Sequence, residues 1–308
     1  MINPPNLFLI GAPKAGTSAV ANILSKHEDI YCWKKEPRFF DAHTYYKNPS
    51  YHPIKDIDEY LSYYDNDIAK VAKYRLDASV FNMYSVKSIH NILRMSPDAK
   101  FILIIRDPLS ATKSMFNQRL KYIDRSMREV SDDFLDCWKL LDARSRGEGF
   151  PENCKAPIVF RYDYLYHYER YIPEILSIVK SSNIKIMTYE DFKNNPEFFI
   201  YHLQNWLKIK EAFSESDTKV INPSIIIKNS LWNQVIWQIK NKSIYLRLRL
   251  GMTGKRVRFF NKIILKSALN NTKDTLCDYD SIIKDEFIET YDYLSQAKRD
   301  GIISVLRE

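Results

Sequence analysis

The sequence predicts an α/β domain with a central parallel β-sheet flanked by helices, followed by a basic helical C-terminal appendage. Three observations predict this fold class. An apolar run opens into a glycine-containing turn and a helical pattern over 7–24, and a second apolar run ends at a proline over 100–108. Strand and helix patterns then alternate across roughly the first two hundred residues. We therefore expect an α/β core over 1–217 and a basic helical region over 218–308 that packs on it.

The first predicted elements are a strand and the helix that follows it. Leu7 to Ile10 are consecutive apolar residues, the length and composition of a short buried strand. The next residues, Gly11 to Ser18, read G-A-P-K-A-G-T-S, and apolar residues then recur at helical spacing over 19–24. A strand, a glycine-rich turn and a helix in this order are typical of the opening of a nucleotide-binding α/β unit.

The middle of the chain predicts a long connection and a second strand. Residues 31–66 have no sustained period and read as loop, with a short helix near Ile57–Tyr64. Apolar residues on one face predict a helix over Ser85–Met95. Lys100–Ile105 is a second buried strand, which Arg106-Asp107-Pro108 ends before a new helix begins near Ser110.

Later segments extend the alternation. Ile158–Phe160 is predicted to be another short strand, and Tyr168–Val179 a helix. Ile184–Met187 is a further strand. Asn195-Pro196 opens the next helix, whose apolar residues repeat every three or four positions.

Composition narrows the class of protein. Of 308 residues, 45% are hydrophobic and 27% charged, as in a folded globular protein. The four cysteines form no C-x-x-C pair, which argues against zinc and against a disulfide scaffold. The N-terminus has no basic segment with a long apolar stretch behind it, and no apolar run is long enough to span a membrane. We therefore expect a cytoplasmic enzyme; the oligomeric state stays open.

Positive charge is concentrated in the C-terminal third. The net charge is +8, and no Asp or Glu occurs between Thr218 and Lys273. Such a stretch attracts anions, for example a nucleotide, a sulfated partner or a lipid surface, and it equally suits a solvated helical face. We expect no nucleic-acid partner.

The strongest local signal is the turn at 11–18. In a P-loop ATPase the lysine follows the second glycine, where it reaches the terminal phosphates. Here Thr17 occupies that position, and Lys14 lies inside the loop. Backbone N–H groups at the start of the helix still form an anion cradle. The cradle residues that we predict are Lys14, Ala15, Gly16, Thr17 and Ser18.

A second anion site is predicted after the strand at Lys100–Ile105. Arg106 follows the carboxyl end of this strand, where open α/β sheets bind ligands. Ser114 lies two turns into the following helix. Together these two side chains suit a phosphate group held from two sides.

The two motifs together resemble those of the sulfotransferases that use 3′-phosphoadenosine 5′-phosphosulfate (PAPS). GAPKAGTS is similar to that family's 5′-phosphosulfate loop, and IIRDPLSATKS to its 3′-phosphate motif. Tyr189 to Phe192 also match a family strand end. The resemblance implies a P-loop NTPase-like fold, PAPS as donor, adenosine 3′,5′-bisphosphate (PAP) as product and no metal requirement. It implies that Lys14 contacts the bridging oxygen and that Arg106 and Ser114 hold the 3′-phosphate.

A third segment, Lys34 to Asp41, resembles the glutamate loop of the family's heparan-sulfate-type and bacterial branch. The resemblance implies that Glu36 removes the acceptor proton, a role that suits a carboxylate whose pKa is raised by burial. Neighbouring lysines and Arg38 oppose such a rise. His90 is the alternative base.

The acceptor is not readable from the residues. We expect transfer to a hydroxyl or amine of a small natural product, with a glycan as the alternative. Two other classes stay open. One is a P-loop small-molecule kinase, and the other is an anion- or membrane-binding protein that acts through the basic stretch.

Overall fold

The computed structural model describes residues 2–210, 279–304 and 306. Of these, residues 2–210 and 281–304 belong to one compact unit. The predicted boundary between 217 and 218, and the basic stretch that follows it, lie outside the described residues. The division of the chain into a core and an appendage therefore stays a prediction.

Five parallel strands form the described sheet, in the order β2-β3-β1-β4-β5. Their bounds are β1 Leu7–Gly11, β2 Ile30–Tyr31, β3 Tyr74–Asp77, β4 Lys100–Ile105 and β5 Ile184–Thr188. The predicted α/β class with a parallel sheet is confirmed. From β1 the chain runs to β2 and β3 on one side, and afterwards to β4 and β5 on the other. The carboxyl ends of β1 and β4 thus flank the crevice at which such sheets bind ligands.

Helices surround the sheet and connect its strands. The α-helices are α1 Thr17–Leu24, α2 Ala42–Tyr45, α3 Ile57–Ser62, α4 Asp67–Val71, α5 Val86–Met95, α6 Pro108–Leu120, α7 Phe134–Lys139, α8 Leu141–Ser145, α9 Tyr162–Leu165, α10 Tyr168–Ile178, α11 Tyr189–Asn194, α12 Pro196–Leu207, α16 Asp280–Glu286 and α17 Ile288–Arg299. Short 3₁₀ helices are η1 Pro49–Tyr51, η2 Asn82–Tyr84, η3 Arg125–Met127, η4 Pro157–Phe160 and η5 Ser181–Asn183.

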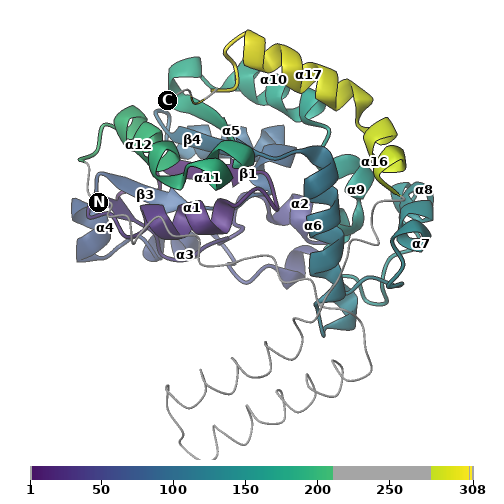
Figure 1. Cartoon of the computed structure of the whole chain (residues 1–308). Helices are drawn as coiled ribbons and strands as arrows, with labels where there is room; N and C mark the ends of the chain where they lie inside the picture. Colours follow the sequence, from purple (N-terminus) through teal and green to yellow (C-terminus); the bar gives the residue numbers. More distant parts are fainter. Residues whose placement is uncertain (1, 211–278, 305, 307–308) are drawn as a thin grey trace, which may run out of the picture. The chain divides into compact units, whose positions relative to one another are not determined.

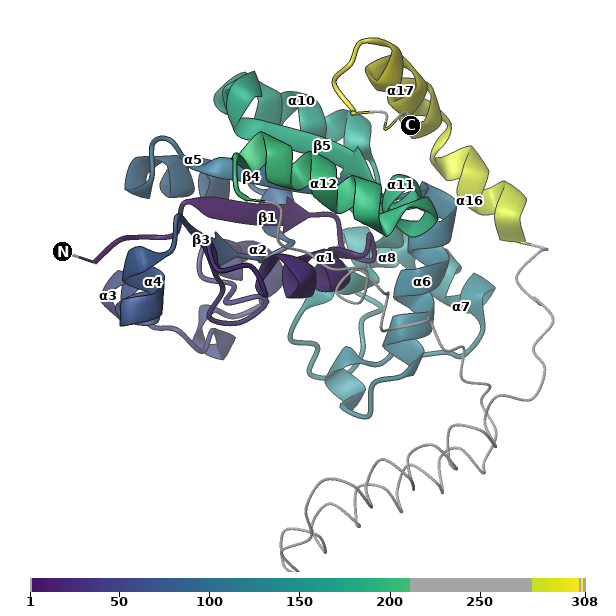
Figure 2. The ribbon, with the colours of Figure 1, turned by 60° about the vertical axis from the view of Figure 1, so that its left-hand side comes forward.

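Helices cover both faces of the sheet. Figures 1 and 2 show α1, α11 and α12 on one face and α5 and α10 on the other. This arrangement follows from right-handed crossovers, because the β1–β2 connection and the β3–β4 connection run in opposite directions along the sheet. The helix α17 packs along α10, so residues near the C-terminus complete the layer over that face.

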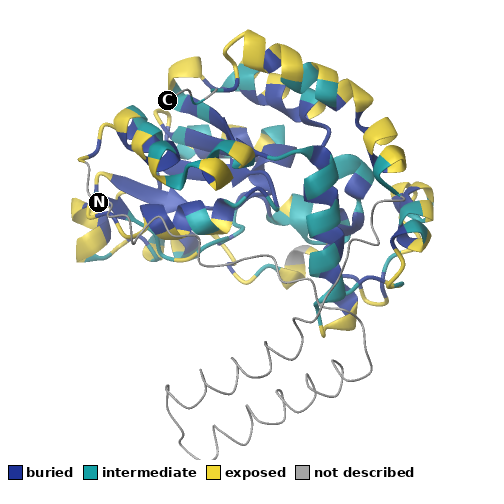
Figure 3. Ribbon diagram, viewed as in Figure 1, coloured by how far each residue is buried: buried dark blue, intermediate teal, exposed yellow. Residues whose placement is uncertain are grey.

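The core lies between the sheet and these helices. The strands are buried almost throughout, as the dark blue ribbon in Figure 3 shows. Rings fill much of the space, since Phe8 stacks on Phe101 with a centroid distance of 5.7 Å and meets Phe40 edge-on. Buried rings of this kind supply large apolar area and define the spacing between layers.

One predicted element is wrong. Ile158–Phe160, predicted to be a strand, lies in the 3₁₀ helix η4. Pro157 begins this helix, and proline has no N–H for a sheet ladder and a backbone torsion that suits a helix start. The three apolar residues are buried in either conformation, so their pattern could not distinguish the two.

Two strands, β2 and β3, were missed. β3, Tyr74–Asp77, contains an arginine and an aspartate and therefore lacks an apolar run, yet all four residues are buried. Asp77 accepts hydrogen bonds from Tyr60 Oη at 2.6 Å and from the Ser79 N–H at 2.9 Å. Arg75 donates to the carbonyls of Pro4 and Ala72. These contacts satisfy both polar groups inside the sheet.

Candidate active site

The predicted anion cradle lies between β1 and α1. Gly16 precedes α1 in the left-handed conformation, with φ of 75°, and a Cβ there would come within 2.8 Å of the Tyr189 ring. Only glycine fits both constraints. No side chain of the described residues caps the N-terminus of α1, so its backbone N–H groups face the loop. In the cradle Ala15 and Thr17 are buried, and Ser18 is exposed. This is the geometry of an anion-binding loop.

Lys14 lies at the centre of a group of basic side chains. We call Lys14, Lys35, Arg106, Arg119 and Lys121 the cation cluster. Burial and the charges of the other four members lower the pKa of Lys14 to about 8. Like charges that share a buried site repel one another, so the cluster is stabilised by an anion that binds among them.

Arg106 is held at the end of β4 by its backbone. Its N–H and its carbonyl both hydrogen-bond the Tyr168 hydroxyl, at 3.2 and 3.0 Å. Its Nη1 donates to the Lys14 carbonyl at 2.9 Å, and its guanidinium lies 4.5 Å from the centroid of the Tyr189 ring. Its Nε is buried without a hydrogen-bond acceptor among the described residues. The structure therefore brings two predicted site residues, Lys14 and Arg106, together.

Ser114 lies halfway along α6 and is half-buried. Asp107 caps this helix by accepting a hydrogen bond from the Ser110 N–H at 2.7 Å, and Tyr291 of α17 donates to the same carboxylate at 2.9 Å. Proline at the first helical position suits the helix start. The Arg-Asp-Pro sequence thus ends a strand, caps a helix and leaves the arginine at the crevice.

Glu36 lies beside the cradle in a loop under backbone strain. Lys14, Glu36 and Arg38 all have positive φ, near 60–68°. Such a conformation costs a residue other than glycine about 1–3 kcal/mol, and it concentrates at functional sites. Glu36 forms ion pairs with Lys35 and Arg38. Burial raises the pKa of Glu36, but the charges of Arg38, Lys35 and Lys14 outweigh burial and hold this pKa below its usual value.

Asp41 is a carboxyl group that the sequence analysis did not single out. It is completely buried, and its Oδ2 lies 3.7 Å from Nη1 of Arg38. Burial raises the pKa of Asp41 to about 7, although the Arg38 charge opposes the shift. Arg38 therefore connects two carboxyl groups of different pKa. The signal that could have found Asp41 is its position in the same charged segment as Glu36.

The alternative base, His90, lies exposed on α5, which covers the face of the sheet opposite α1. Glu36, in contrast, lies close enough to Lys14 for the lysine's charge to lower its pKa. The structure thus brings Glu36, and not His90, to the cradle.

The described residues contain no group of three or more His, Cys, Asp or Glu placed to hold a metal ion. Nor does any helix within the described ranges have the length and apolar character needed to cross a membrane.

A parallel α/β fold with a cation-lined loop at the carboxyl ends of β1 and β4 defines a nucleotide-binding enzyme of the group-transfer class. The Sulfotransferase family model matches residues 5–213, and the chain belongs to that family. The predicted resemblance to PAPS-dependent sulfotransferases is confirmed.

Known relatives match at low identity. A bifunctional heparan sulfate N-deacetylase/N-sulfotransferase 1 from Caenorhabditis briggsae is 21% identical over 67% of this chain and 23% of its own length. The heparan sulfate glucosamine 3-O-sulfotransferase 3B1 of Mus musculus is 30% identical over 38% of this chain and 27% of its length. The matches thus span about a quarter of these curated relatives.

A solved structure has a similar fold. The sulfotransferase from Alicyclobacillus acidocaldarius has a TM-score of 0.59 and 21% sequence identity, over 83% of this chain and all of that protein. The likeness agrees with the parallel sheet and its helical layers.

Proposed function

We propose that this chain transfers a sulfuryl group from PAPS to a hydroxyl or amine of an acceptor. The observation that carries the proposal is that Lys14 and Arg106, which lie on two different loops, meet at the carboxyl ends of β1 and β4. Burial and the neighbouring positive charges lower the pKa of Lys14, so an anion that binds there stabilises its charged form. PAPS has negative groups at two positions of one nucleotide, the 5′-phosphosulfate and the 3′-phosphate.

The residues of the cradle fit this donor. The backbone N–H groups of 15–18 and the Lys14 ammonium suit the 5′-phosphosulfate, and Arg106 with Ser114 suits the 3′-phosphate. The orphaned Nε of Arg106 supports this fit, because a buried donor requires an acceptor.

PAPS supplies the sulfuryl group on an oxygen of its 5′-phosphate, and the chain stabilises the charge that develops as this bond breaks. The Lys14 ammonium is suited to neutralise the bridging oxygen, and the loop N–H groups would act in the same direction. Fixed positive groups in a buried site stabilise such charge without reorganisation. Holding donor and acceptor in line supplies a further part of the rate.

Glu36 is the proposed proton acceptor. The ion pairs that lower its pKa keep it ionised at neutral pH, so it accepts a proton without first losing one. Because a carboxylate of low pKa is a weak base, the proton moves as the oxygen–sulfur or nitrogen–sulfur bond forms, and not before it.

The proposal for the acceptor covers its reacting group and its chemical class. A hydroxyl or amine acceptor agrees with the relatives, whose names specify N- and 3-O-sulfotransferases of heparan sulfate. Those names support a glycan, while a small natural product stays the prediction from sequence.

Nucleotide binding tests the proposal. PAP should raise the melting temperature of the protein, and ATP with Mg²⁺ should not, since Thr17 replaces the P-loop lysine. Arg106→Ala should weaken PAP binding most. A larger stabilisation by ATP with Mg²⁺ than by PAP would favour the kinase alternative. Conversion of labelled PAPS with a mixed acceptor library, followed by mass spectrometry, then identifies the product.

A further inference from the structure

A buried arginine near the cradle is not among the residues proposed to hold the donor. Arg119, near the C-terminal end of α6, is 3% exposed. Its Nε and Nη1 make no hydrogen bond with any described residue, and no carboxylate in the described ranges forms an ion pair with it. A buried guanidinium with two unbonded nitrogens is costly, so its retention requires an explanation.

The sequence limits what else could pair with Arg119. The basic stretch from Thr218 to Lys273 contains no Asp or Glu. That stretch therefore has no carboxylate to offer, and no described carboxylate pairs with Arg119. An anion from outside the chain would satisfy the two unbonded nitrogens.

Aromatic side chains surround the Arg119 guanidinium. It lies 4.2 Å from the centroid of the Tyr122 ring and 6.0 Å from that of Phe160. Its charge also acts on the Tyr45 hydroxyl. The Arg38 guanidinium lies over the Tyr45 ring, 3.5 Å from the ring centroid. Tyr45 and Tyr122 are both partly exposed, so solvent reaches this region. We call Arg119, Tyr45 and Tyr122 the Arg119 subsite.

The Arg119 subsite is connected to the proposed base by neighbouring side chains. The charge of Arg119 acts on Lys14 and on Tyr45, and Arg38 contacts both the Tyr45 ring and Glu36. These residues form a chain of neighbours from the proposed base to Arg119.

Arg119 lies further along α6 than the residues proposed for the donor's 3′-phosphate. It follows Ser114 by five positions, about 7.5 Å at the helical rise of 1.5 Å per residue. Arg106 precedes this helix, and Ser114 lies in its middle. Arg119 thus supplies a third cationic position, beyond those that the two ends of PAPS require.

We propose that Arg119 binds an oxyanion of the acceptor, so that this enzyme selects acceptors that carry a carboxylate or sulfate group. The planar guanidinium matches either group with two parallel hydrogen bonds. Tyr45 and Tyr122 then flank the ring that bears the anion. This inference rests on the proposed function, because it assigns the acceptor side of the same site.

The test uses the full chain saturated with PAP and four probes that need no turnover. D-Glucuronate and D-glucose 6-sulfate carry the anion, while D-glucuronamide and D-glucose are their neutral counterparts. In calorimetric titration, the anionic probes should bind at least tenfold more tightly than the neutral ones. The stronger of the two anionic probes identifies the source as carboxylate or sulfate.

Two variants assign the effect to Arg119. Arg119→Met should weaken binding of the anionic probes at least tenfold and leave the dissociation constant of PAP within twofold. Arg119→Lys keeps the positive charge but loses the planar guanidinium with its parallel N–H donors. This variant should bind the anionic probes with intermediate affinity. It also serves as the test should Arg119→Met fail to fold.

Other outcomes overturn the inference. A tenfold loss of PAP affinity in Arg119→Met or Arg119→Lys would assign Arg119 to the donor. Equal binding of charged and neutral probes would exclude an oxyanion of the acceptor as the group that Arg119 binds. So would a lack of detectable binding of either anionic probe to the PAP-loaded protein. If PAP itself does not bind the wild-type chain, the proposed function fails, and this inference fails with it.

Discussion

Two buried arginines near the same aromatic ring have opposite surroundings. Arg144 lies 5.5 Å from the Phe160 centroid and Arg119 lies 6.0 Å from it. Arg144 pairs with Glu129 through hydrogen bonds of 2.9 and 2.7 Å and also donates to the carbonyls of Phe160 and Gly149. The Tyr162 hydroxyl donates a further hydrogen bond to Glu129 Oε1 at 2.5 Å.

The difference indicates which buried charge belongs to the fold and which belongs to the site. Arg144 and Glu129 cancel each other's charge, so their desolvation is offset within the chain. Arg119 lies against the rings of Tyr122 and Phe160, and its charge acts on Lys14. It therefore destabilises the free protein and favours an anion.

The largest expected effect is on stability at the paired site. Arg144→Met leaves Glu129 buried without its cation and should lower the free energy of unfolding by about 3–5 kcal/mol. Arg119→Met, the same change at a similarly buried residue, should leave stability unchanged or raise it. Urea denaturation of both variants measures the contrast. Equal losses in the two variants would show that both arginines are structural.

The next effect is on catalysis at Lys14. Lys14→Ala should lower the rate of sulfuryl transfer roughly 10²–10³-fold, the loss typical of one electrostatic group in a preorganised site. Its melting temperature should stay at or above the wild-type value, because one of several like charges is removed. Lys100→Ala is the matched control, since Lys100 is also half-buried but lies at the opposite end of β4. Near-normal turnover of Lys14→Ala would exclude the mechanism.

A pH profile sharpens the assignment of Lys14. Because its pKa in the free protein is about 8, the ammonium form is lost as the pH rises through that value. The ratio kcat/KM, which reports free-enzyme groups, should therefore fall on the alkaline side with an apparent pKa near 8. Lys14→Arg should shift this decline out of the measurable range. A rate that increases through pH 8 would contradict the role of the ammonium.

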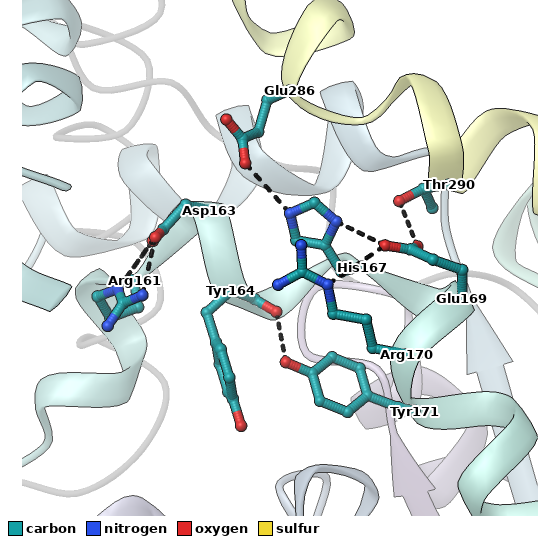
Figure 4. Close-up of polar contacts among 9 residues, drawn as sticks. All are labelled: Arg161, Asp163, Tyr164, His167, Glu169, Arg170, Tyr171, Glu286 and Thr290. Atoms are coloured by element: carbon teal, nitrogen blue, oxygen red, sulfur yellow. Dashed lines mark hydrogen bonds and ion pairs between the residues drawn. The ribbon is translucent and has the colours of Figure 1, made fainter. Parts of the chain in front are cut away.

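The smallest expected effect concerns His167, which joins α10 to the C-terminal helices. Figure 4 shows its ring between Glu169, at 2.7 Å, and Glu286, at 3.2 Å. Burial lowers the pKa of His167, but Glu286 and Glu169 outweigh burial and Arg170, so the pKa is raised above 6.5. Thr290 of α17 donates to the same Glu169.

This raised pKa predicts the direction of a pH effect on stability. A group whose pKa is higher in the folded protein stabilises it fully below the unfolded value, and that stability is lost as the pH rises through the folded value. The stability difference between wild type and His167→Gln should thus be larger at pH 6 than at pH 8.5. A constant difference would mean that the ring stays neutral.

Much of the fold follows from local sequence. The strands β1, β4 and β5 and the helices α1, α6 and α12 were predicted within a residue or two, because apolar runs, glycine and proline act over short distances. η4, β2 and β3 were not, since burial and pairing with distant segments decide their conformation. Asn6 illustrates this dependence, because its side chain and backbone bind β3 residues.

The sequence by itself determined the cradle and its arginine: Lys14 inside the loop, Gly16 before the helix and Arg106 after β4. Each depends on neighbours within a few residues. Only the tertiary structure decided the surroundings of the charges. Among the described residues Arg144 has a carboxylate partner and Arg119 has none, and Arg38 connects Glu36 to Asp41. The sequence specifies which side chains are charged, but packing between distant segments decides which partner each charge has. The physical reason is that desolvation and pairing depend on the whole fold.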